Sequence, residues 1–578
     1  MKDIFKIFTI FTPKQQRYCG VIVFCMVIGA MLEAVGIGAI LPLISIMGDE
    51  GFLDKHIVVK QYAEILNITT HTSFIIFSSA LLIILYVLKN LYMAWLTKLQ
   101  INFSTQNQIV YAEGLLEGYI SKPYLYHLDQ NSATLLRNVS SGPILIFTGI
   151  LIPTFTLLTE AITAVTIWSM LILVDAFTAI IVAGLLGAMM YAILKTFRKK
   201  IAKRGEVQNK YSALYMKWLN QGLGAIKETK VLRKEKYFLD EFVGAYQKYG
   251  QANGDFNFIN QLPRMFIETM VTSTLLILII VKLMMGIQPM EIVPILGVLA
   301  LAAFRLMPCA NRIVNLSNGI KFQMPLFNLL YDELIAIKER KLQYEAKTCE
   351  EKEQLGFNKE IKVEKLTFRY PQGKKEVLKQ ISFSIPKGCF VGIVGQSGAG
   401  KTTFVDIMLG LLNPSNGKIL VDSVDIFENI RAWQANLSYV PQSIYLIDGS
   451  IRENIALGIP EQEIDDDKID KVLKMAELYE FVEELPEKSY TYVGERGVKL
   501  SGGQRQRIGI ARALYYEPEV LILDEATSAL DNETEKSITH TILKLKGQIT
   551  IIAIAHRVST LEECDFKIKF NEGQVERI

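Results

Sequence analysis

The sequence has few cysteines and no strong excess of charge of either sign. Its 578 residues include six cysteines, with no CxxC pair and no histidine at metal-ligand spacing. This scatter argues against a disulfide framework and against a zinc site. The formal net charge is only +3, so the overall charge gives no indication of nucleic-acid binding, and we expect no nucleic acid as a partner. The cysteines are Cys19, Cys25, Cys309, Cys349, Cys389 and Cys564.

The N-terminus lacks the small-residue cleavage site of a secretory signal peptide. Residues 1–17, MKDIFKIFTIFTPKQQR, carry four Lys/Arg and precede an apolar run that is too long for the core of such a signal. We therefore predict an uncleaved first membrane span.

Apolar residues are abundant instead, and they are unevenly distributed. They make up 50% of the chain, the mean hydropathy is +0.25, and long apolar runs fill residues 18–315. A bilayer core needs about 20 apolar residues per helix, which predicts six transmembrane helices. The predicted organisation is a transmembrane domain at 1–320, a linker at 321–356 and a soluble α/β domain at 357–578. The predicted spans are 18–47, 73–97, 142–173, 176–196, 265–286 and 289–311.

Basic residues between the spans indicate the orientation. They gather after the second and fourth spans and before the first, so the positive-inside rule places both termini in the cytoplasm. The inside segments 98–141 and 197–262 are long and poor in Gly and Pro, so we expect the helices to continue tens of ångströms into the cytosol, at about 1.5 Å per residue. Outside, residues 57–66 are compatible with a surface amphipathic helix or with a solvated loop.

Charged residues inside apolar spans are costly unless they face a cavity or a partner. Arg264, Arg305 and Arg312 lie in or near the predicted cytoplasmic leaflet, and three guanidiniums at that depth can bind a phosphate or pyrophosphate headgroup. Alternatively, they pair with Glu160 and Glu268 and hold helices together. Glu33 lies between Gly29 and Gly36, a face that suits close helix packing as well as a site.

The first motif in the C-terminal part that indicates a chemical function is a phosphate-binding loop. Residues 392–410 predict a buried strand, a glycine-rich turn and a helix, with the spacing of a P-loop. Glycines let backbone N–H groups face phosphates, Lys401 reaches the β- and γ-phosphates, and the Thr402 hydroxyl binds Mg²⁺. The predicted ATP-binding residues here are Gly395, Gln396, Ser397, Gly398, Ala399, Gly400, Lys401, Thr402 and Thr403.

A second apolar strand, VLILDE, ends in two carboxylates. Asp524 suits the Mg²⁺ shell, and Glu525 is placed to polarise the water that attacks the γ-phosphate. Between the P-loop and this strand stands LSGGQRQR, residues 500–507. With this element the C-terminal part resembles the nucleotide-binding domain of an ATP-binding cassette (ABC) protein.

The resemblance covers about 357–578 and implies further roles. Tyr370 corresponds to the aromatic residue that stacks on adenine, and Gln442 to a glutamine that serves the Mg²⁺ ion and catalysis. His556 corresponds to the histidine that contacts the γ-phosphate. Two cassettes of the family enclose two ATP molecules, each between one P-loop and the opposite signature motif, so a second copy of the chain is implied. The signature residues here are Ser501, Gly502, Gly503 and Gln504, and Ser528–Asp531 resembles the loop that follows the catalytic strand.

Six spans before one cassette resemble an ABC exporter half-transporter. Residues 491–497, with Glu495, resemble the loop that contacts the membrane part in exporters. The tips of the two long inside segments, 121–138 and 222–238, resemble the coupling regions that dock on the cassettes. No motif residue is degenerate, so both sites of a homodimer are expected to hydrolyse ATP.

The cargo is indicated by the spans. The stretches LPRMFIE and AFRLMPCANRI, at 262–268 and 303–313, resemble bacterial PglK-type flippases of lipid-linked oligosaccharides. This resemblance implies that a polyprenyl-pyrophosphate glycan moves from the inner to the outer leaflet of a bacterial inner membrane. The alternatives are an exporter of a lipid A-like lipid, a drug or a peptide, and an ABC-gated channel. A soluble ABC ATPase of translation or DNA repair is excluded by the six apolar spans.

Overall fold

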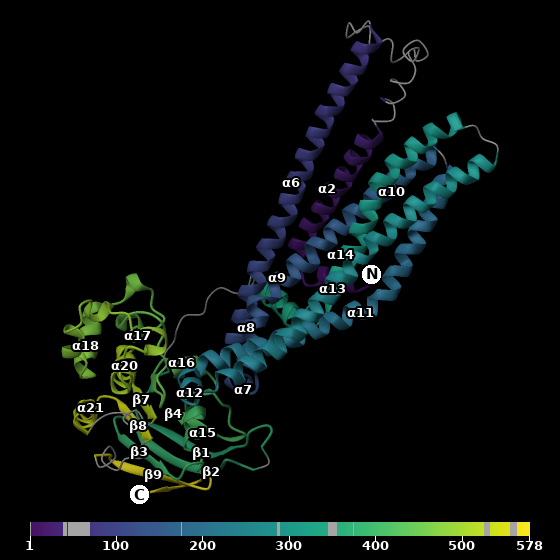
Figure 1. Ribbon diagram of the computed structural model, residues 1–578. Coiled ribbons are helices and arrows are strands. Elements are labelled where there is room, and N and C mark those ends of the chain that lie inside the picture. Colours follow the sequence, from purple (N-terminus) through teal and green to yellow (C-terminus); the bar gives the residue numbers. More distant parts are fainter. Residues whose placement is uncertain are drawn as a thin grey trace. The chain divides into compact units, whose positions relative to one another are not determined.

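The chain folds as two compact units, which are described separately. The computed structural model describes residues 2–38, 43, 70–174, 176–285, 289–344, 355–373, 375–524, 532–554 and 563–578. One unit, the helical unit, comprises Met1–Lys122 and Asp129–Thr348, and the other, the α/β unit, comprises Pro123–Leu128 and Cys349–Ile578. The predicted order of a helical part before an α/β part is therefore what the structure shows (Figure 1).

Four helices of the helical unit exceed the thickness of a bilayer. The helices α6, α11, α13 and α14 have 50, 49, 50 and 56 residues, which at about 1.5 Å per residue is more than twice the roughly 30 Å of a hydrocarbon core. The predicted inside segments are thus largely continuations of the spans. The helices of the unit are α1 (Lys2–Thr9), α2 (Pro13–Gly38), α6 (His71–Ile120), α8 (Ser132–Ser140), α9 (Gly142–Ile146), the π-helix η1 (Phe147–Leu151), α10 (Ile152–Val174), α11 (Ala176–Gly224), α12 (Ile226–Val231), α13 (Glu235–Met284) and α14 (Pro289–Tyr344).

Within the described residues, four helical segments are long and apolar enough to cross a membrane. They are Pro13–Glu33, His71–Ile120, Gly142–Ser169 and Glu235–Met284. The other two predicted spans, 176–196 and 289–311, lie in α11 and α14. The last part of the first predicted span and the 57–66 segment fall outside the described residues.

Close backbone approach holds several of these helices together. A Cβ atom at Gly205 of α11 would lie 2.1 Å from the carbonyl oxygen of Phe322 in α14, so only glycine fits there. Phe322 also stacks on Phe256 of α13, with ring centroids 4.1 Å apart. In α2, Gly29 lies against Met93 and Leu96 of α6. The small-residue face around Glu33 is therefore a packing face between α2 and α6.

The predicted linker begins inside a helix. Residues 321–344 form the last part of α14, and the two units divide between Thr348 and Cys349. The physical reason is burial, because this part of α14 carries an apolar stripe that includes Phe322, Phe327, Leu330 and Leu334, each at most 4% exposed. A linker boundary at 321 is thus too early by about two dozen residues.

Two sheets form the framework of the α/β unit. An antiparallel sheet has the strand order β2-β1-β4-β5, and a six-stranded sheet has the order β10-β9-β3-β8-β7-β6, in which β9, β3, β8, β7 and β6 are parallel. The strands are β1 (Glu360–Phe368), β2 (Leu378–Pro386), β3 (Phe390–Gly395), β4 (Asn416–Val421), β5 (Val424–Asp425), β6 (Leu437–Val440), β7 (Val520–Asp524), β8 (Thr550–Ile554), β9 (Phe566–Asn571) and β10 (Gln574–Arg577).

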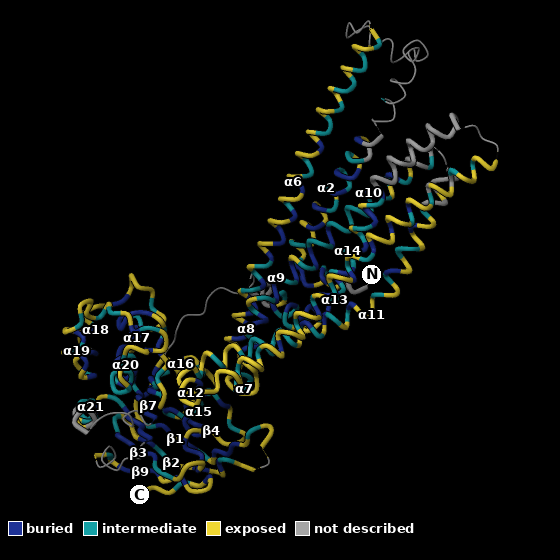
Figure 2. The backbone as a smooth tube through the Cα atoms, in the orientation of Figure 1, coloured by how far each residue is buried: buried dark blue, intermediate teal, exposed yellow. Residues whose placement is uncertain are grey.

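Helices cover the parallel sheet, whose strands are mostly buried (Figure 2). One core cluster joins β3, β7 and β8 to α15 and the antiparallel sheet, and another joins these strands to α17, α18 and α20. Buried parallel strands carry continuous apolar runs, which explains why VLIL and IIAI were recognisable as strands. The helices are α7 (Tyr124–Asp129), α15 (Lys401–Met408), α16 (Ile430–Gln434), α17 (Ile451–Ile455), α18 (Asp466–Met475), α19 (Tyr479–Glu483), α20 (Gly502–Tyr515) and α21 (Asn532–Lys544), with short 3₁₀ turns at Glu461–Glu463, Lys488–Tyr490 and Glu495–Gly497.

Candidate nucleotide-binding site

The glycine-rich turn between β3 and α15 has the conformation of a phosphate cradle. Gly395, Gly398 and Gly400 have φ angles of 149°, 81° and 104°, which side chains of L-residues rarely permit. A Cβ atom at Gly395 would also lie 2.4 Å from the carbonyl oxygen of Phe570. The helix α15 begins directly after the turn, at Lys401. Backbone N–H groups at such a helix N-terminus form an anion-binding site.

The side chain of Lys401 packs against this turn. It is 7% exposed, and Nζ donates hydrogen bonds to the carbonyl oxygens of Gly395, at 2.7 Å, and Gln396, at 3.0 Å. Both partners are neutral carbonyl groups, and hydrogen bonds from an ammonium group to an anion are stronger than those to neutral acceptors. The ammonium group thus lies at the glycine-rich turn, where it can bind an anion.

A cavity of about 460 Å³ lies beside the turn and gathers residues from three strand ends. Gln442 follows β6, Asp524 ends β7 and Ile554 ends β8. The carboxyl ends of parallel strands meet at one edge of a sheet, where open α/β folds place their ligands. Residues that stand more than 120 positions apart in the sequence therefore share one site. The lining residues are Val377, Ser397, Gly398, Gly400, Lys401, Thr402, Thr403, Gln442, Asp524 and Ile554.

A tyrosine hydroxyl contacts Asp524, which is 9% exposed. The Tyr439 hydroxyl on β6 donates a hydrogen bond to Asp524 Oδ2 at 3.2 Å. Burial, together with the negative charge of Asp524, raises the pKa of Asp406 on α15 to about 6. Burial also raises the pKa of Tyr439, followed by the charge of Asp524, so the phenol stays protonated and remains a donor at neutral pH.

Tyr370, predicted to stack on adenine, lies next to the cradle but not in the cavity wall. Its hydroxyl is 3.2 Å from Thr403 Oγ1, and its ring packs edge-on against Phe368 with centroids 4.9 Å apart. The ring is half-buried at the end of β1. Gly395, Gln396 and Ala399 belong to the turn itself.

The signature residues stand at a different helix. Ser501 is the N-cap of α20, where its side chain accepts from Gln504 N at 3.2 Å and its own N–H donates to Gln504 Oε1 at 2.8 Å. This reciprocal capping box shapes the helix start that Gly502 and Gly503 begin. None of the four residues is among those lining the cavity. Within this chain the P-loop and the signature motif thus form separate surfaces.

The predicted catalytic residues Glu525 and His556, and the segment Ser528–Asp531, lie outside the described residues. Their neighbours are described, because Asp524 directly precedes Glu525 and Ile554 stands two residues before His556, and both line the cavity. Glu495, in the loop predicted to contact the membrane part, begins the short 3₁₀ turn Glu495–Gly497.

The three predicted cargo arginines have different surroundings in the helical unit. Arg264 is exposed on α13, one turn before the exposed Glu268. Arg312 Nη1 lies 2.6 Å from Glu160 Oε1, which joins α14 to α10. Arg305 lies in α14. The pair of Arg312 and Glu160 corresponds to the alternative in which such charges hold helices together.

Lys89 is a charged residue inside a predicted span that the sequence analysis did not consider. Lys89 of α6 is 9% exposed, and its Nζ lies 4.7 Å from the ring centre of Tyr86. Gly36 of α2 packs against both residues. A lysine in the middle of the apolar run 73–97 is a visible signal, because an intramembrane charge is costly. Glu33, also in α2, accepts a hydrogen bond from Thr163 at 3.3 Å.

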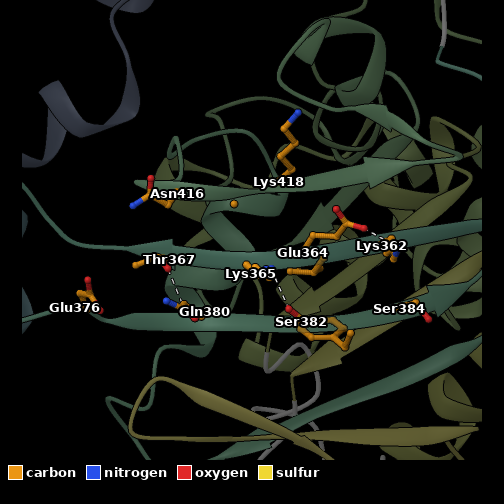
Figure 3. Close-up of a pocket in the computed structure, with 13 residues that line it drawn as sticks. Lys362, Glu364, Lys365, Thr367, Glu376, Gln380, Ser382, Ser384, Asn416 and Lys418 are labelled. Carbon is orange, nitrogen blue, oxygen red and sulfur yellow. Dashed lines mark hydrogen bonds and ion pairs between the residues drawn. The ribbon is translucent and has the colours of Figure 1, made fainter.

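A second hollow, of about 1030 Å³, lies over the antiparallel sheet (Figure 3). Its lining comes from β1, β2 and β4 and from the residues just before β2, and it carries both charge signs, with Lys362 and Glu364 paired at 2.6 Å. None of the residues predicted to bind nucleotide is among its lining.

Comparison with known proteins reveals similarity at two levels. Residues 378–528 match the family model described as ABC transporter. Over the whole chain, the fold is similar to that of a bacterial Atm1-family ABC exporter with ATP bound, with a TM-score of 0.69, 21% identity, and coverage of 97% of this chain and 95% of that one. This likeness confirms the predicted fold class, a polytopic helical membrane domain followed by an α/β nucleotide-binding domain.

Curated relatives match over a shorter stretch. An ATP-dependent lipid A-core flippase of Alkalilimnicola ehrlichii is 42% identical over 216 residues, which is 37% of this chain and 36% of that protein. The heterocyst differentiation ATP-binding protein HepA of a Nostoc species is 42% identical over 221 residues, 38% of this chain and 36% of the relative. The ABC transporter BEA3 of Gibberella fujikuroi is 41% identical over 221 residues, 38% and 17% respectively. The chain thus spans about a third or less of the curated relatives it matches.

Proposed function

We propose that this chain, which has the fold of an ABC exporter, is an ATP hydrolase that drives the movement of a lipid-linked substrate across a membrane. The observation that carries the proposal is the cavity in which Lys401, Thr402, Gln442 and Asp524 converge on the glycine-rich turn. The turn N–H groups and Lys401 would bind the β- and γ-phosphates of ATP.

The donor set of the cavity fits a magnesium ion. A threonine hydroxyl, a glutamine amide and a carboxylate are hard oxygen ligands, and Mg²⁺ in such sites uses one or two carboxylates together with substrate phosphates. When bound, the ion neutralises charge on the transferring phosphoryl group. The chain itself would supply Glu525 to orient and deprotonate the attacking water, and His556 to contact the γ-phosphate.

A second copy of the chain is proposed to complete each site. The signature residues do not line the cavity of their own chain, so an ATP molecule held at the P-loop would meet Ser501–Gln504 of the partner copy. Two apolar side chains of α12, Ile226 and Val231, are 48% and 75% exposed, and they lie in the predicted coupling region 222–238. Such exposed apolar residues suit a docking helix whose partner is the other copy's α/β unit.

The proposed cargo is a polyprenyl-pyrophosphate oligosaccharide, moved from the inner to the outer leaflet of a bacterial inner membrane with both termini cytoplasmic. Arg264, Arg305 and Arg312 would bind the pyrophosphate, and Lys89 adds a buried cation inside the predicted span 73–97. A lipid A-like lipid is the second candidate, because a relative is named as a lipid A-core flippase. Both cargoes carry anionic phosphate groups that arginine binds bidentately.

The decisive experiment is ATP-dependent translocation of a fluorescent polyprenyl-pyrophosphate oligosaccharide in proteoliposomes. Variants with Arg264, Arg305 and Arg312 replaced by glutamine should lose transport and keep ATP hydrolysis. Arg204→Gln is the matched control, since Arg204 pairs with Asp255 at 2.6 Å elsewhere in the helical unit and should transport normally. Wild-type ATP hydrolysis without transport would reject this cargo, and lipid A would be tested next.

The nucleotide site has its own test. Lys401→Ala removes the buried ammonium group, so the affinity for ATP should fall by roughly 100-fold or more, as expected for a charge-assisted contact of about 3 kcal/mol. Equilibrium binding of a fluorescent ATP analogue to the full chain measures this. Wild-type affinity in Lys401→Ala would reject the P-loop assignment.

A further inference from the structure

Tyr439 of β6 contacts Asp524 but has no role in the proposed function. Its hydroxyl donates a hydrogen bond to Asp524, and it is not among the residues that line the cavity. A group in this position acts on Asp524 rather than directly on the nucleotide.

Sheet register brings Tyr439 to Asp524. In the parallel pair of β6 and β7, Tyr439 stands opposite Ile522, two residues before Asp524. Because side chains of a strand alternate between faces, Ile522 and Asp524 point to the same face. That face packs against α15, since Ile522 and Phe404 of α15 belong to one core cluster and Tyr439 packs against it. The phenol thus extends beneath the end of β7.

A side-chain hydrogen bond links Tyr439, near the end of β6, to Asp524, at the end of β7. The Tyr439 hydroxyl donates to Asp524 Oδ2 at 3.2 Å. Tyr439 also stands three residues before Gln442, which lines the cavity. This bond restrains one oxygen of the carboxylate, whose χ2 angle has only a broad intrinsic preference. Ligand carboxylates of metal sites are commonly held by such partners.

We infer that Tyr439 is a positioning residue for the magnesium ion, with its hydroxyl orienting the Asp524 carboxylate. This inference rests on the proposed ATP site and extends it by one residue. The chemical class of the ligand is a divalent cation bound together with a nucleoside triphosphate.

Magnesium titration of the full-length protein tests the inference. The probe is AMP-PNP, a non-hydrolysable ATP analogue, and the readout is the rise in unfolding temperature as Mg²⁺ is added. Tyr439→Phe should raise the Mg²⁺ concentration for half-maximal effect by roughly 10- to 100-fold, the size expected when a metal ligand loses its outer hydrogen-bond partner. AMP-PNP binding in EDTA should stay within about twofold of wild type, because the contact reaches the nucleotide only through the metal.

Tyr515→Phe is the matched control. Tyr515 is 4% exposed in the other core cluster, and its hydroxyl accepts a hydrogen bond from the Asp465 N–H at 3.2 Å. This change should leave the Mg²⁺ requirement as in wild type. Equal Mg²⁺ requirements for Tyr439→Phe and Tyr515→Phe would overturn the inference.

Tyr439→Met is the second variant if Tyr439→Phe does not fold. It also lacks the hydroxyl donor, so it should raise the Mg²⁺ requirement in the same direction, and an unchanged requirement would overturn the inference. A wild-type protein that shows no response to AMP-PNP, with or without Mg²⁺, would overturn the proposed ATP site itself. A wild-type response with unaltered variants rejects only the positioning role of Tyr439.

Discussion

The nucleotide cavity and the charged residues of the helical unit differ in how far apart in the sequence their contacting residues lie. At the cavity, one turn of the chain supplies Gly398, Gly400, Lys401 and Thr402, and three neighbouring strand ends supply Gln442, Asp524 and Ile554. In the helical unit, Arg312 meets Glu160 across 152 residues, from α14 to α10. Local backbone geometry determines the first site, whereas the second depends on how separate helices pack.

This difference also concerns the tolerance of each region to change. The cradle depends on backbone conformations that only glycine adopts readily, so substitution there acts on the chemistry. The helix seams depend on close approach, as at Gly205, so substitution there acts on packing and leaves the chemistry of the α/β unit intact. The predictions below separate these two kinds of effect.

The largest effect is expected at the end of β7. Glu525→Gln should lower the ATP turnover rate by roughly 100-fold or more, because it removes the proposed base that activates water, and should keep ATP binding intact. Steady-state phosphate release together with ATP binding measures both. Brisk turnover in this variant would contradict the catalytic role of Glu525.

A methyl group at Gly205 should act on packing alone. Gly205→Ala meets the Phe322 carbonyl at 2.1 Å, and overpacking of this kind should lower the unfolding temperature of the full chain by roughly 3–10 °C. Gly319→Ala is the control on α14, since no atom lies within 4 Å of its added Cβ, and it should raise that temperature slightly through helix propensity. Equal shifts in the two variants would mean that α11 and α14 do not approach closely at Gly205.

We expect Asp565 to make the stability of the protein depend on pH in the acid range. Burial acts to raise the pKa of its carboxyl, but the Lys546 ammonium at 2.7 Å and the Phe390 N–H at 2.8 Å outweigh burial and hold the pKa below its usual value. The stability that Asp565 contributes is therefore present above its unfolded pKa near 4 and is lost as the pH falls through the lower folded value.

Asp565→Asn tests this contribution. At pH 7 it should destabilise the protein by about 1 kcal/mol, a value already reduced for the partial exposure of the ion pair, and it should flatten the fall of unfolding temperature below about pH 4. Thermal unfolding across pH 3–8 measures this. A wild-type acid profile in the variant would exclude the role of Asp565.

The smallest effect on stability is expected at the ion pair of the helical unit. The Arg312 side chain is 59% exposed, so Arg312→Gln and Glu160→Gln should each change stability by at most about 1 kcal/mol. Transport distinguishes the two roles of Arg312. Loss of transport in Arg312→Gln alone indicates pyrophosphate binding, whereas equal behaviour of both variants indicates a bond between helices.

Much of the α/β unit was predictable because its signals are local. GQSGAGKTT encodes a turn whose glycines permit positive φ, and VLILD and IIAI are continuous apolar strands that parallel burial requires. The contribution of Tyr439 was not predictable, since LSYV is equally an ordinary strand. Only the register of β6 against β7 places its hydroxyl at Asp524.

In the helical unit the sequence predicted spans but not their ends or partners. The run 289–311 is an apolar segment that continues to Tyr344 as one helix, because the stripe through Phe327 and Leu334 is buried. Lys89 stands in an apolar run, yet its burial beside Tyr86 depends on the approach of α2 through Gly36.

The sequence by itself determined the two-part organisation, the P-loop turn and the strand that ends in Asp524, because periodicity, apolar runs and glycine conformation act within a few residues. Only the tertiary structure decided that Gln442 and Asp524 share a cavity with Lys401, that Arg312 meets Glu160, and that the signature residues stand apart from their own P-loop. Contacts between distant segments depend on strand order, register and helix packing, which no short stretch of sequence contains.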